Sequence, residues 1–183
     1  MSEQNEYILK TLIHEQKNNH YYIIGMKKIL NPYTKVEGHN CFGCSPNNDQ
    51  GLKMKFFEDG EYIISDWKPT GFLQGFHNIL HGGIQATLMD EIGSWFVQVK
   101  MKTAGVTSSM NVRYLKPVSA VNGNIKLFAS LLKKRRNLVD VYVELFDGDQ
   151  KLCAQGELTY FTYSKEVAQQ KLHYPDYDEF FHE

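Results

Sequence analysis

The longest regular pattern of apolar residues lies in the middle of the chain. Between His81 and Lys100, apolar side chains recur at steps of three and four, which is the spacing of one face of an α-helix. The members of this face are Ile84, Leu88, Ile92, Trp95, Phe96 and Val99. Because apolar residues cover most of the circumference, the pattern predicts a long helix that the rest of the domain largely encloses.

Alternation of apolar and polar residues predicts β-strands on both sides of this helix. Before the helix, residues 52–56 and 62–67 flank Asp59-Gly60, a hairpin turn signal, and residues 68–80 are typical of a loop. After the helix, the alternating segments are 107–114, 123–132, 138–146 and 151–163. The predicted fold class is α+β, with a curved antiparallel sheet wrapped around one long central helix.

The two ends of the chain carry weaker patterns. Residues 3–18 show the spacing of a short amphipathic helix, and residues 21–30 fit a helix or a strand equally well. Residues 31–51 are rich in Gly, Pro and Asn, which favours a loop. We therefore expect an N-terminal helical extension over 1–39, one domain over 40–164, and a C-terminal tail over 165–183 that begins with a short helix.

Composition narrows the class of protein. Charged residues make up 22% of the 183 residues and the net charge is −1, so there is no basic excess to indicate nucleic-acid binding. No apolar run is long enough for a transmembrane helix, and the polar first residues do not resemble a signal peptide. The three cysteines are too few for a disulfide framework. We expect a cytoplasmic protein with no nucleic-acid or membrane partner.

Candidate chemistry lies at the start of the central helix. A helix N-terminus presents unpaired backbone N–H groups and a partial positive charge, and Gly82 and Gly83 would let a substrate approach it closely. These N–H groups would stabilise the oxyanion of a reacting carbonyl. Asp90, on a face of otherwise small residues, would serve as a general base for water or as a nucleophile.

The helix geometry separates these two groups. Seven residues from Gly83 to Asp90 correspond to roughly 10 Å of axial rise. A general base must lie within about 3 Å of the proton it takes, or reach it through one water. If both groups serve one reaction, the acid comes from a second copy of the chain. The spacing therefore predicts a two-fold homodimer with active sites shared across the interface.

Four motifs together resemble the hotdog-fold thioesterase superfamily, in the branch of phenylacetyl-CoA and related acyl-CoA thioesterases. They span about residues 40–163, and their order and spacing are more specific than any one of them. The motifs are His81-Gly82-Gly83 with Asp90-Glu91, Asn40-Cys41-Phe42-Gly43-Cys44 with Gly51-Leu52, Gly71-Phe72-Leu73-Gln74-Gly75, and Val112-Arg113-Tyr114-Leu115-Lys116-Pro117-Val118.

This resemblance implies hydrolysis of acyl-CoA thioesters in a dimer that is often paired into a tetramer. It implies that Gly82 donates its N–H to the thioester oxygen and that Asp90 activates water. A hydroxyl on the following strand would position that water, from Thr107, Ser108 or Ser109, and we favour Ser108 slightly. No cofactor is implied, because coenzyme A enters as part of the substrate.

Two neighbouring positions complete the expected machinery. His81 is expected to orient the start of the helix more than to act as a base. Many relatives carry Asn or Gln where this chain has Gly75, and Asn78 is the substitute that we consider. Gly83, Asn78 and Thr107 are further residues that we expect to bind the substrate.

Basic residues are candidates for binding the phosphates of coenzyme A. They are Arg113 and, within the run 133–136, Lys134, Arg135 and Arg136. The alternative for the run is a solvated hairpin that discourages edge pairing. The aromatic residues Phe72, Phe76, Trp95 and Phe96 either line an acyl pocket or belong to the core, and the core is the commoner case.

Cys41 and Cys44 form a C-x-x-C pair, a spacing that zinc sites and redox sites share. A structural zinc site takes four ligands, and the sequence offers only Cys153 and histidines that are not paired at ligand spacing. We therefore expect a packed loop beside the substrate, without a metal.

Two other functions fit the same residues. The first is a non-catalytic acyl-CoA-binding or sensing module, for which the missing amide at Gly75 is the argument, and tight binding without turnover would identify it. The second is a hydratase or dehydratase, which would need His81 to move a proton next to the thioester. The position of Asp90 within the helix favours hydrolysis over the hydratase or dehydratase reaction.

Overall fold

A seven-stranded antiparallel sheet forms the body of the protein in a computed structural model, which describes residues 26–182. The helix expected over residues 3–18 therefore lies outside the described residues. The strands lie side by side in the order β1-β2-β3-β7-β8-β9-β6, so β1 and β6 are the two edges. Their bounds are β1 Lys27–Ile29, β2 Phe56–Asp59, β3 Tyr62–Trp67, β6 Gly105–Tyr114, β7 Ile125–Arg135, β8 Leu138–Phe146 and β9 Leu152–Thr162.

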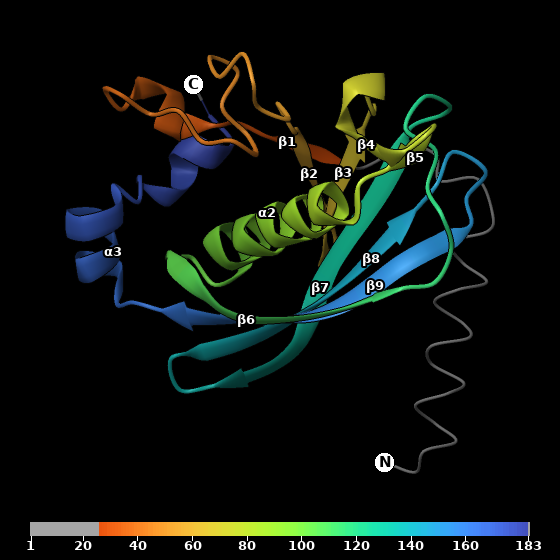
Figure 1. The fold of residues 1–183 in the computed structure, drawn as a ribbon. Coiled ribbons are helices and arrows are strands. Elements are labelled where there is room, and N and C mark those ends of the chain that lie inside the picture. The colour runs from red at the N-terminus through yellow and green to blue at the C-terminus, as the bar shows by residue number, and fades with distance from the viewer. Residues whose placement is uncertain (1–25, 183) are drawn as a thin grey trace, which may run out of the picture.

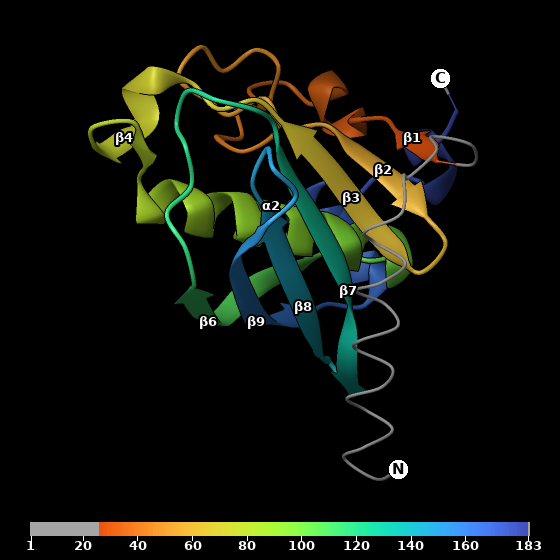
Figure 2. The same ribbon diagram turned by 90° about the vertical axis from the view of Figure 1, so that its right-hand side faces the viewer.

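The helix α2 (Gly82–Lys100) lies across the concave face of this sheet (Figure 1). Seen from the side, the strands curve around it (Figure 2). Its apolar face forms the centre of the core, where Leu88, Met89 and Ile92 are fully buried. The predicted helix and the wrapped antiparallel sheet are confirmed.

The strand predicted over residues 52–56 is wrong, because β2 begins only at Phe56. Tertiary contacts hold the preceding residues as a loop instead. The backbone N–H groups of Leu52 and Met54 donate to the loop carbonyls of Phe42 and Gly43, at 2.7 and 2.9 Å. Lys53 adopts a left-handed backbone with φ of 53°, which no regular strand accommodates.

The connection predicted over residues 68–80 contains a small hairpin, β4 (Gln74–Phe76) with β5 (Ile79–Leu80), preceded by a 3₁₀ turn over Gly71–Leu73. This two-stranded sheet leads directly into α2. The ambiguous segment 21–30 is a strand in its described part, β1. A further 3₁₀ turn covers Pro32–Lys35 in the predicted loop.

The C-terminal segment adds to the core. The predicted short helix is α3 (Lys165–Leu172), and a 3₁₀ turn follows over Tyr177–Phe180. The Phe180 side chain is fully buried and packs edge-on against Trp95 of α2, with ring centroids 5.9 Å apart. No helix in the described part of the chain is long and apolar enough to cross a membrane.

Candidate active site

The start of α2 is capped by the side chain of His81. Its ring nitrogen Nδ1 accepts a hydrogen bond of 2.9 Å from the backbone N–H of Gly83. The backbone carbonyl of the same histidine accepts from Ile84 and Gln85 at 3.0 and 3.1 Å. An N-cap with this pattern satisfies donors that the helix cannot satisfy itself. The expectation that His81 orients the helix start agrees with this geometry.

The cap pairs the backbone N–H of Gly83 with the His81 ring, whereas the backbone N–H of Gly82 stays unpaired among the described residues. The backbone carbonyl of Gly82 accepts a hydrogen bond of 2.9 Å from the hydroxyl of Tyr114. This bond links the first turn of α2 to the edge strand β6. Of the two glycines considered from sequence, Gly82 is therefore the one whose N–H can donate to a ligand.

Asp90 lies two turns into α2 and is held by two hydroxyl groups of its own chain. The Thr107 hydroxyl donates to Asp90 Oδ1 at 2.8 Å. The Tyr160 hydroxyl, from β9, lies 3.0 Å from the same Oδ1 and 2.8 Å from the Asp90 backbone carbonyl. Oδ2, the other carboxylate oxygen, has no hydrogen-bond partner among the described residues. One oxygen is thus fixed while the other can accept a proton.

Tyr160 was not identified from the sequence. Burial, followed by the charge of the adjacent Asp90 carboxylate, raises the pKa of Tyr160 well above its usual value. The phenol therefore remains a hydrogen-bond donor at physiological pH. Gly93 makes room for it one turn along the helix, because a Cβ there would collide with the Tyr160 hydroxyl.

The predicted preference for Ser108 as the helper hydroxyl does not match the contacts within one chain. The register between β6 and β9 pairs Thr107 with Tyr160 and Ser109 with Thr159, so Ser108 is the extra residue of a β-bulge. The bulge re-aims the local side chains, and Thr107 is the residue that contacts Asp90. Any contribution of Ser108 to a substrate bound between chains stays a prediction.

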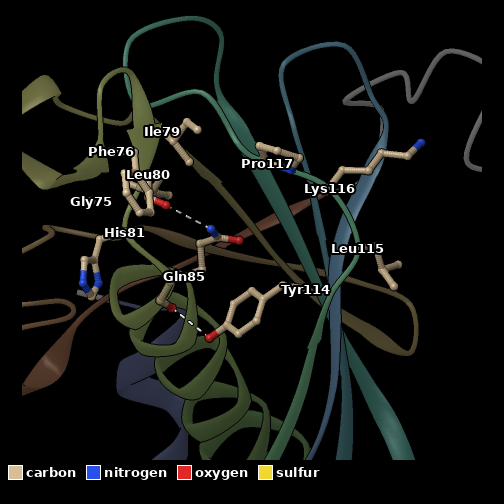
Figure 3. Close-up of a pocket in the computed structure, with 11 residues that line it drawn as sticks. Gly75, Phe76, Ile79, Leu80, His81, Gln85, Tyr114, Leu115, Lys116 and Pro117 are labelled. Carbon is tan, nitrogen blue, oxygen red and sulfur yellow. Dashed lines mark hydrogen bonds between the residues drawn. The ribbon is translucent and has the colours of Figure 1, made fainter.

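A cavity of about 470 Å³ opens beside the helix start, between the β4–β5 hairpin and the end of β6 (Figure 3). Gln85 and Tyr114 point into the space between these elements, whereas the His81 ring lies on the other side of the helix start (Figure 3). The Gln85 side chain donates to the Leu80 carbonyl at 3.1 Å. Its buried amide oxygen Oε1 has no partner among the described residues, so it offers an acceptor to a ligand.

Gly75, the position at which an amide is considered from sequence, is exposed but leaves little room for a side chain beside His81. A Cβ at Gly75 would lie 3.1 Å from the His81 ring. Asn78, the substitute considered from sequence, lies in the β4–β5 turn with φ of 58°, and its side-chain amide contacts the His77 ring at 3.1 Å. The structure therefore does not bring the Asn78 side chain to the Gly82 N–H.

The predicted phosphate-binding residues lie in two places. Arg113 is exposed on β6, near the cavity. The run 133–136 forms the exposed hairpin between β7 and β8, and Lys134 and Arg136 line a second cavity with Met101, just beyond the C-terminal end of α2. Arg135 pairs with Asp140 through two bonds of 2.7 and 2.9 Å. Within one chain, the run therefore lies at the opposite end of the helix from Gly82.

The candidate acyl-pocket aromatics divide into two pairs. Trp95 and Phe96 are 1% exposed and belong to the core. Phe72 and Phe76 are 76% and 79% exposed, and Phe76 lines the cavity beside the helix start. Phe76 can therefore contact a ligand in that cavity, whereas Phe72 does not line it.

Comparison with known proteins agrees with this geometry. Residues 77–154 match the family model of the thioesterase superfamily. The chain is 35% identical to mouse acyl-coenzyme A thioesterase 13 over 82 residues, which are 44% of this chain and 58% of that protein. The chain spans less than two thirds of the length of the curated relatives that it matches.

Solved structures of other proteins share this fold. Zebrafish thioesterase superfamily member 2 superposes with a TM-score of 0.56 at 27% identity, over 64% of this chain and 88% of that one. A Streptococcus mutans protein solved with acetyl-CoA bound gives 0.58 at 17% identity, over 72% and 98%. The predicted hotdog fold and the resemblance to its thioesterases are confirmed, and the phenylacetyl-CoA branch stays a prediction.

The capping role of His81 can be measured directly. Replacing an N-cap side chain by alanine costs about 1 kcal/mol, and asparagine is among the best caps. We expect His81→Ala to lower the free energy of unfolding in denaturant by about that amount, and His81→Asn to recover most of it. Equal losses for both variants would contradict a cap and point to another role for the imidazole ring.

Proposed function

We propose that this chain, a hotdog-fold protein with the signature of the thioesterase superfamily over residues 77–154, hydrolyses acyl-CoA thioesters. The observation that supports the proposal best is that the described part of the chain carries both an unpaired backbone N–H and a carboxylate fixed in position by hydrogen bonds. Gly82 keeps an unpaired N–H at the helix start, and Asp90 has one carboxylate oxygen fixed by Thr107 and the other available. These are the two groups that attack of water on a thioester requires.

The reaction follows from these groups. Asp90 Oδ2 takes a proton from water as the water oxygen forms a bond to the thioester carbon. The Gly82 N–H donates to the carbonyl oxygen, which becomes negative in the tetrahedral intermediate. The C–S bond then breaks, the carboxylic acid is released, and the departing thiolate takes the proton back from Asp90. Thr107 and Tyr160 keep the carboxylate in place throughout.

Two chains are needed to bring these groups together. Asp90 lies eight positions after Gly82, which corresponds to about 12 Å along one helix. Asp90 is also tied to Thr107 and Tyr160 of its own chain, so it cannot swing to its own helix start. Two antiparallel α2 helices, related by a two-fold axis near Ala86, would place each Asp90 beside the partner's Gly82.

The edge strand β6 supports such a dimer. Its side chains are mostly exposed in the single chain, among them Val106, Met110 and Tyr114 at 44%, 36% and 50%. It presents ten residues of edge, in which the bulge at Ser108 and the charge of Arg113 are the features that could oppose pairing. A partner's β6 would cover this edge and bring the two copies of Thr107 close to the interface.

The same symmetry gives the basic hairpin a role. The region around Met101 and Lys134 lies about 22 Å from Ala86 along the helix, whereas Gly82 lies about 6 Å on the other side. After the two-fold rotation, Lys134 and Arg136 of one chain lie roughly 16 Å beyond the partner's Gly82. An extended pantetheine arm spans such a gap, so these cations would bind the phosphates of the coenzyme.

Asp90 provides the first test. We expect Asp90→Asn to fold normally and to lower kcat for the best acyl-CoA by about 10² to 10⁴, the usual contribution of a general base. Hydrolysis would be followed by release of free thiol over a panel of aliphatic and aryl acyl-CoAs. The matched control is Asp149→Asn, which changes an exposed carboxylate that bonds Lys151 in a surface turn.

Two outcomes would count against the proposal. Full activity in Asp90→Asn would remove the carboxylate from the mechanism. Wild-type protein that binds acyl-CoA tightly but releases no thiol would instead identify a binding or sensing module, the alternative for which the absence of a side chain at Gly75 is the argument.

A substitution at Gly82 can test the backbone N–H donor, because proline has no backbone N–H. Gly82 is the first residue of α2, where proline is favoured, and His81 has φ of −59° and ψ of 134°, which suits the residue before proline. A Cβ there meets Tyr114 only at 3.7 Å and beyond. We expect Gly82→Pro to keep its unfolding midpoint while kcat falls by about 10² to 10³, the cost of losing an oxyanion donor.

The control for this variant is Gly82→Ala, which adds the same Cβ but keeps the N–H. It is expected to retain much more activity than Gly82→Pro. Similar losses in both variants would show that crowding at the helix start, and not the missing donor, lowers the rate.

A further inference from the structure

A second cluster of reactive side chains surrounds Glu91, the residue after Asp90. The Cys41 sulfur lies 3.6 Å from each of the two carboxylate oxygens of Glu91. The ligand atoms of Cys41, Cys44 and Glu91 all lie within 4.8 Å of one another. The C-x-x-C pair noted in the sequence thus gains a third partner from the central helix.

The distance between the Cys41 sulfur and the Glu91 carboxylate matches that between two ligands of a tetrahedral zinc ion. Zinc binds thiolate sulfur at about 2.3 Å and carboxylate oxygen at about 2.0 Å, so two such ligands lie about 3.5 Å apart at a tetrahedral angle. The observed sulfur-to-oxygen distance is 3.6 Å. We propose that Cys41, Cys44 and Glu91 bind one Zn²⁺ ion, with a water molecule as the fourth ligand.

The surroundings of Glu91 are built to present its carboxylate. The indole N–H of Trp95 donates to Glu91 Oε1 at 3.0 Å, an outer hydrogen bond of the kind that orients metal-binding carboxylates. Gly43 makes the close approach possible, because a Cβ there would collide with the Glu91 carboxyl group. Among the described residues, no lysine, arginine or histidine side chain forms an ion pair with this partly buried acid.

The cysteine loop is also held ready for a metal. Its carbonyls at Phe42, Gly43 and Cys44 accept bonds from Leu52, Met54 and Asn31 at 2.7, 2.9 and 3.2 Å. These hydrogen bonds fix the loop that carries both thiols beside the Glu91 carboxylate.

The ligand set selects the metal. Two thiolates are soft ligands that favour Zn²⁺ over Mg²⁺ or Ca²⁺, which take oxygen ligands. Cys153 does not join the cluster; it lies in β9 and contacts Asp147 and the Lys151 carbonyl. The ring nitrogen Nε2 of His39 is buried without a partner among residues 26–182, but His39 is not part of the 4.8 Å group.

Zinc at this place would fasten the loop 41–44 to α2 beside the candidate base. Adjacent residues of a helix point in directions about 100° apart, so Asp90 and Glu91 serve different sites from one turn. With three protein ligands and one water, this would be an open zinc site rather than a closed four-ligand one. The zinc site does not depend on the proposed thioester hydrolysis, since none of its ligands takes part in that chemistry.

The test uses the full chain, purified without a metal-affinity tag, reduced and treated with a chelator. Cobalt(II) is the spectroscopic probe, because thiolate ligation produces an intense charge-transfer band, and Zn²⁺ then competes for the site. We expect one ion per chain, loss of the band in Cys41→Ser and Cys44→Ser, and at least about 100-fold weaker Zn²⁺ binding in Glu91→Gln, beyond the effect of an outer hydrogen-bond partner. Cys153→Ser is the matched control and should bind normally.

A second measurement on the wild-type chain does not depend on how the variants fold. Zn²⁺ should protect Cys41 and Cys44 from alkylation, as read by mass spectrometry of their peptide, while Cys153 serves as the internal reference. Absence of both the cobalt band and the protection would overturn the proposal. So would a Cys41–Cys44 disulfide forming on mild oxidation in protein that binds no zinc, since the pair would then be a redox couple.

Discussion

The rise of an α-helix, about 1.5 Å per residue, is the constraint on which the account of this protein depends. Only the first turn of α2 offers free N–H groups, and capping by His81 leaves Gly82 as the available one. Asp90 lies two turns further and is tied to its own β6 and β9 through Thr107 and Tyr160. Donor and acid are each well placed but cannot meet in one chain. The exposed β6 edge gives a physical route by which a second copy would join them.

Much of the fold could be predicted from periodicity, because the helix and the long strands bury one face each. The apolar residues of α2 at steps of three and four lie in the core, and the alternation over 138–146 matches β8. Where tertiary contacts decide, the sequence was insufficient. Residues 52–55 alternate like a strand, yet hydrogen bonds to the cysteine loop hold them out of the sheet.

The candidate site also combines features that local sequence predicts with features that depend on tertiary contacts. Local rules were enough to propose the helix start and Asp90 as candidates, since both are properties of one element. They did not identify Tyr160, which reaches Asp90 from β9, or Gln85, whose orphaned oxygen faces the cavity. Within one chain Thr107 contacts Asp90, because a bulge at Ser108 in β6 shifts the register by one residue, and the preference for Ser108 stays a prediction. Glu91 was missed as a partner of Cys41 because nothing in the spacing links a loop to a distant helix.

Subunit complementation tests the shared site most directly. Gly82→Pro lacks the donor and Asp90→Asn lacks the base, so each homodimer should be nearly inactive. When the two variants are unfolded together, refolded and allowed to exchange subunits, each mixed dimer regains one intact site from the Gly82 of one chain and the Asp90 of the other. The account predicts that activity rises well above that of either parent, toward about a quarter of wild type for random mixing of two chains and one restored site per mixed dimer. No recovery, with mixed dimers present, would contradict it and place both groups in one chain or in separate roles.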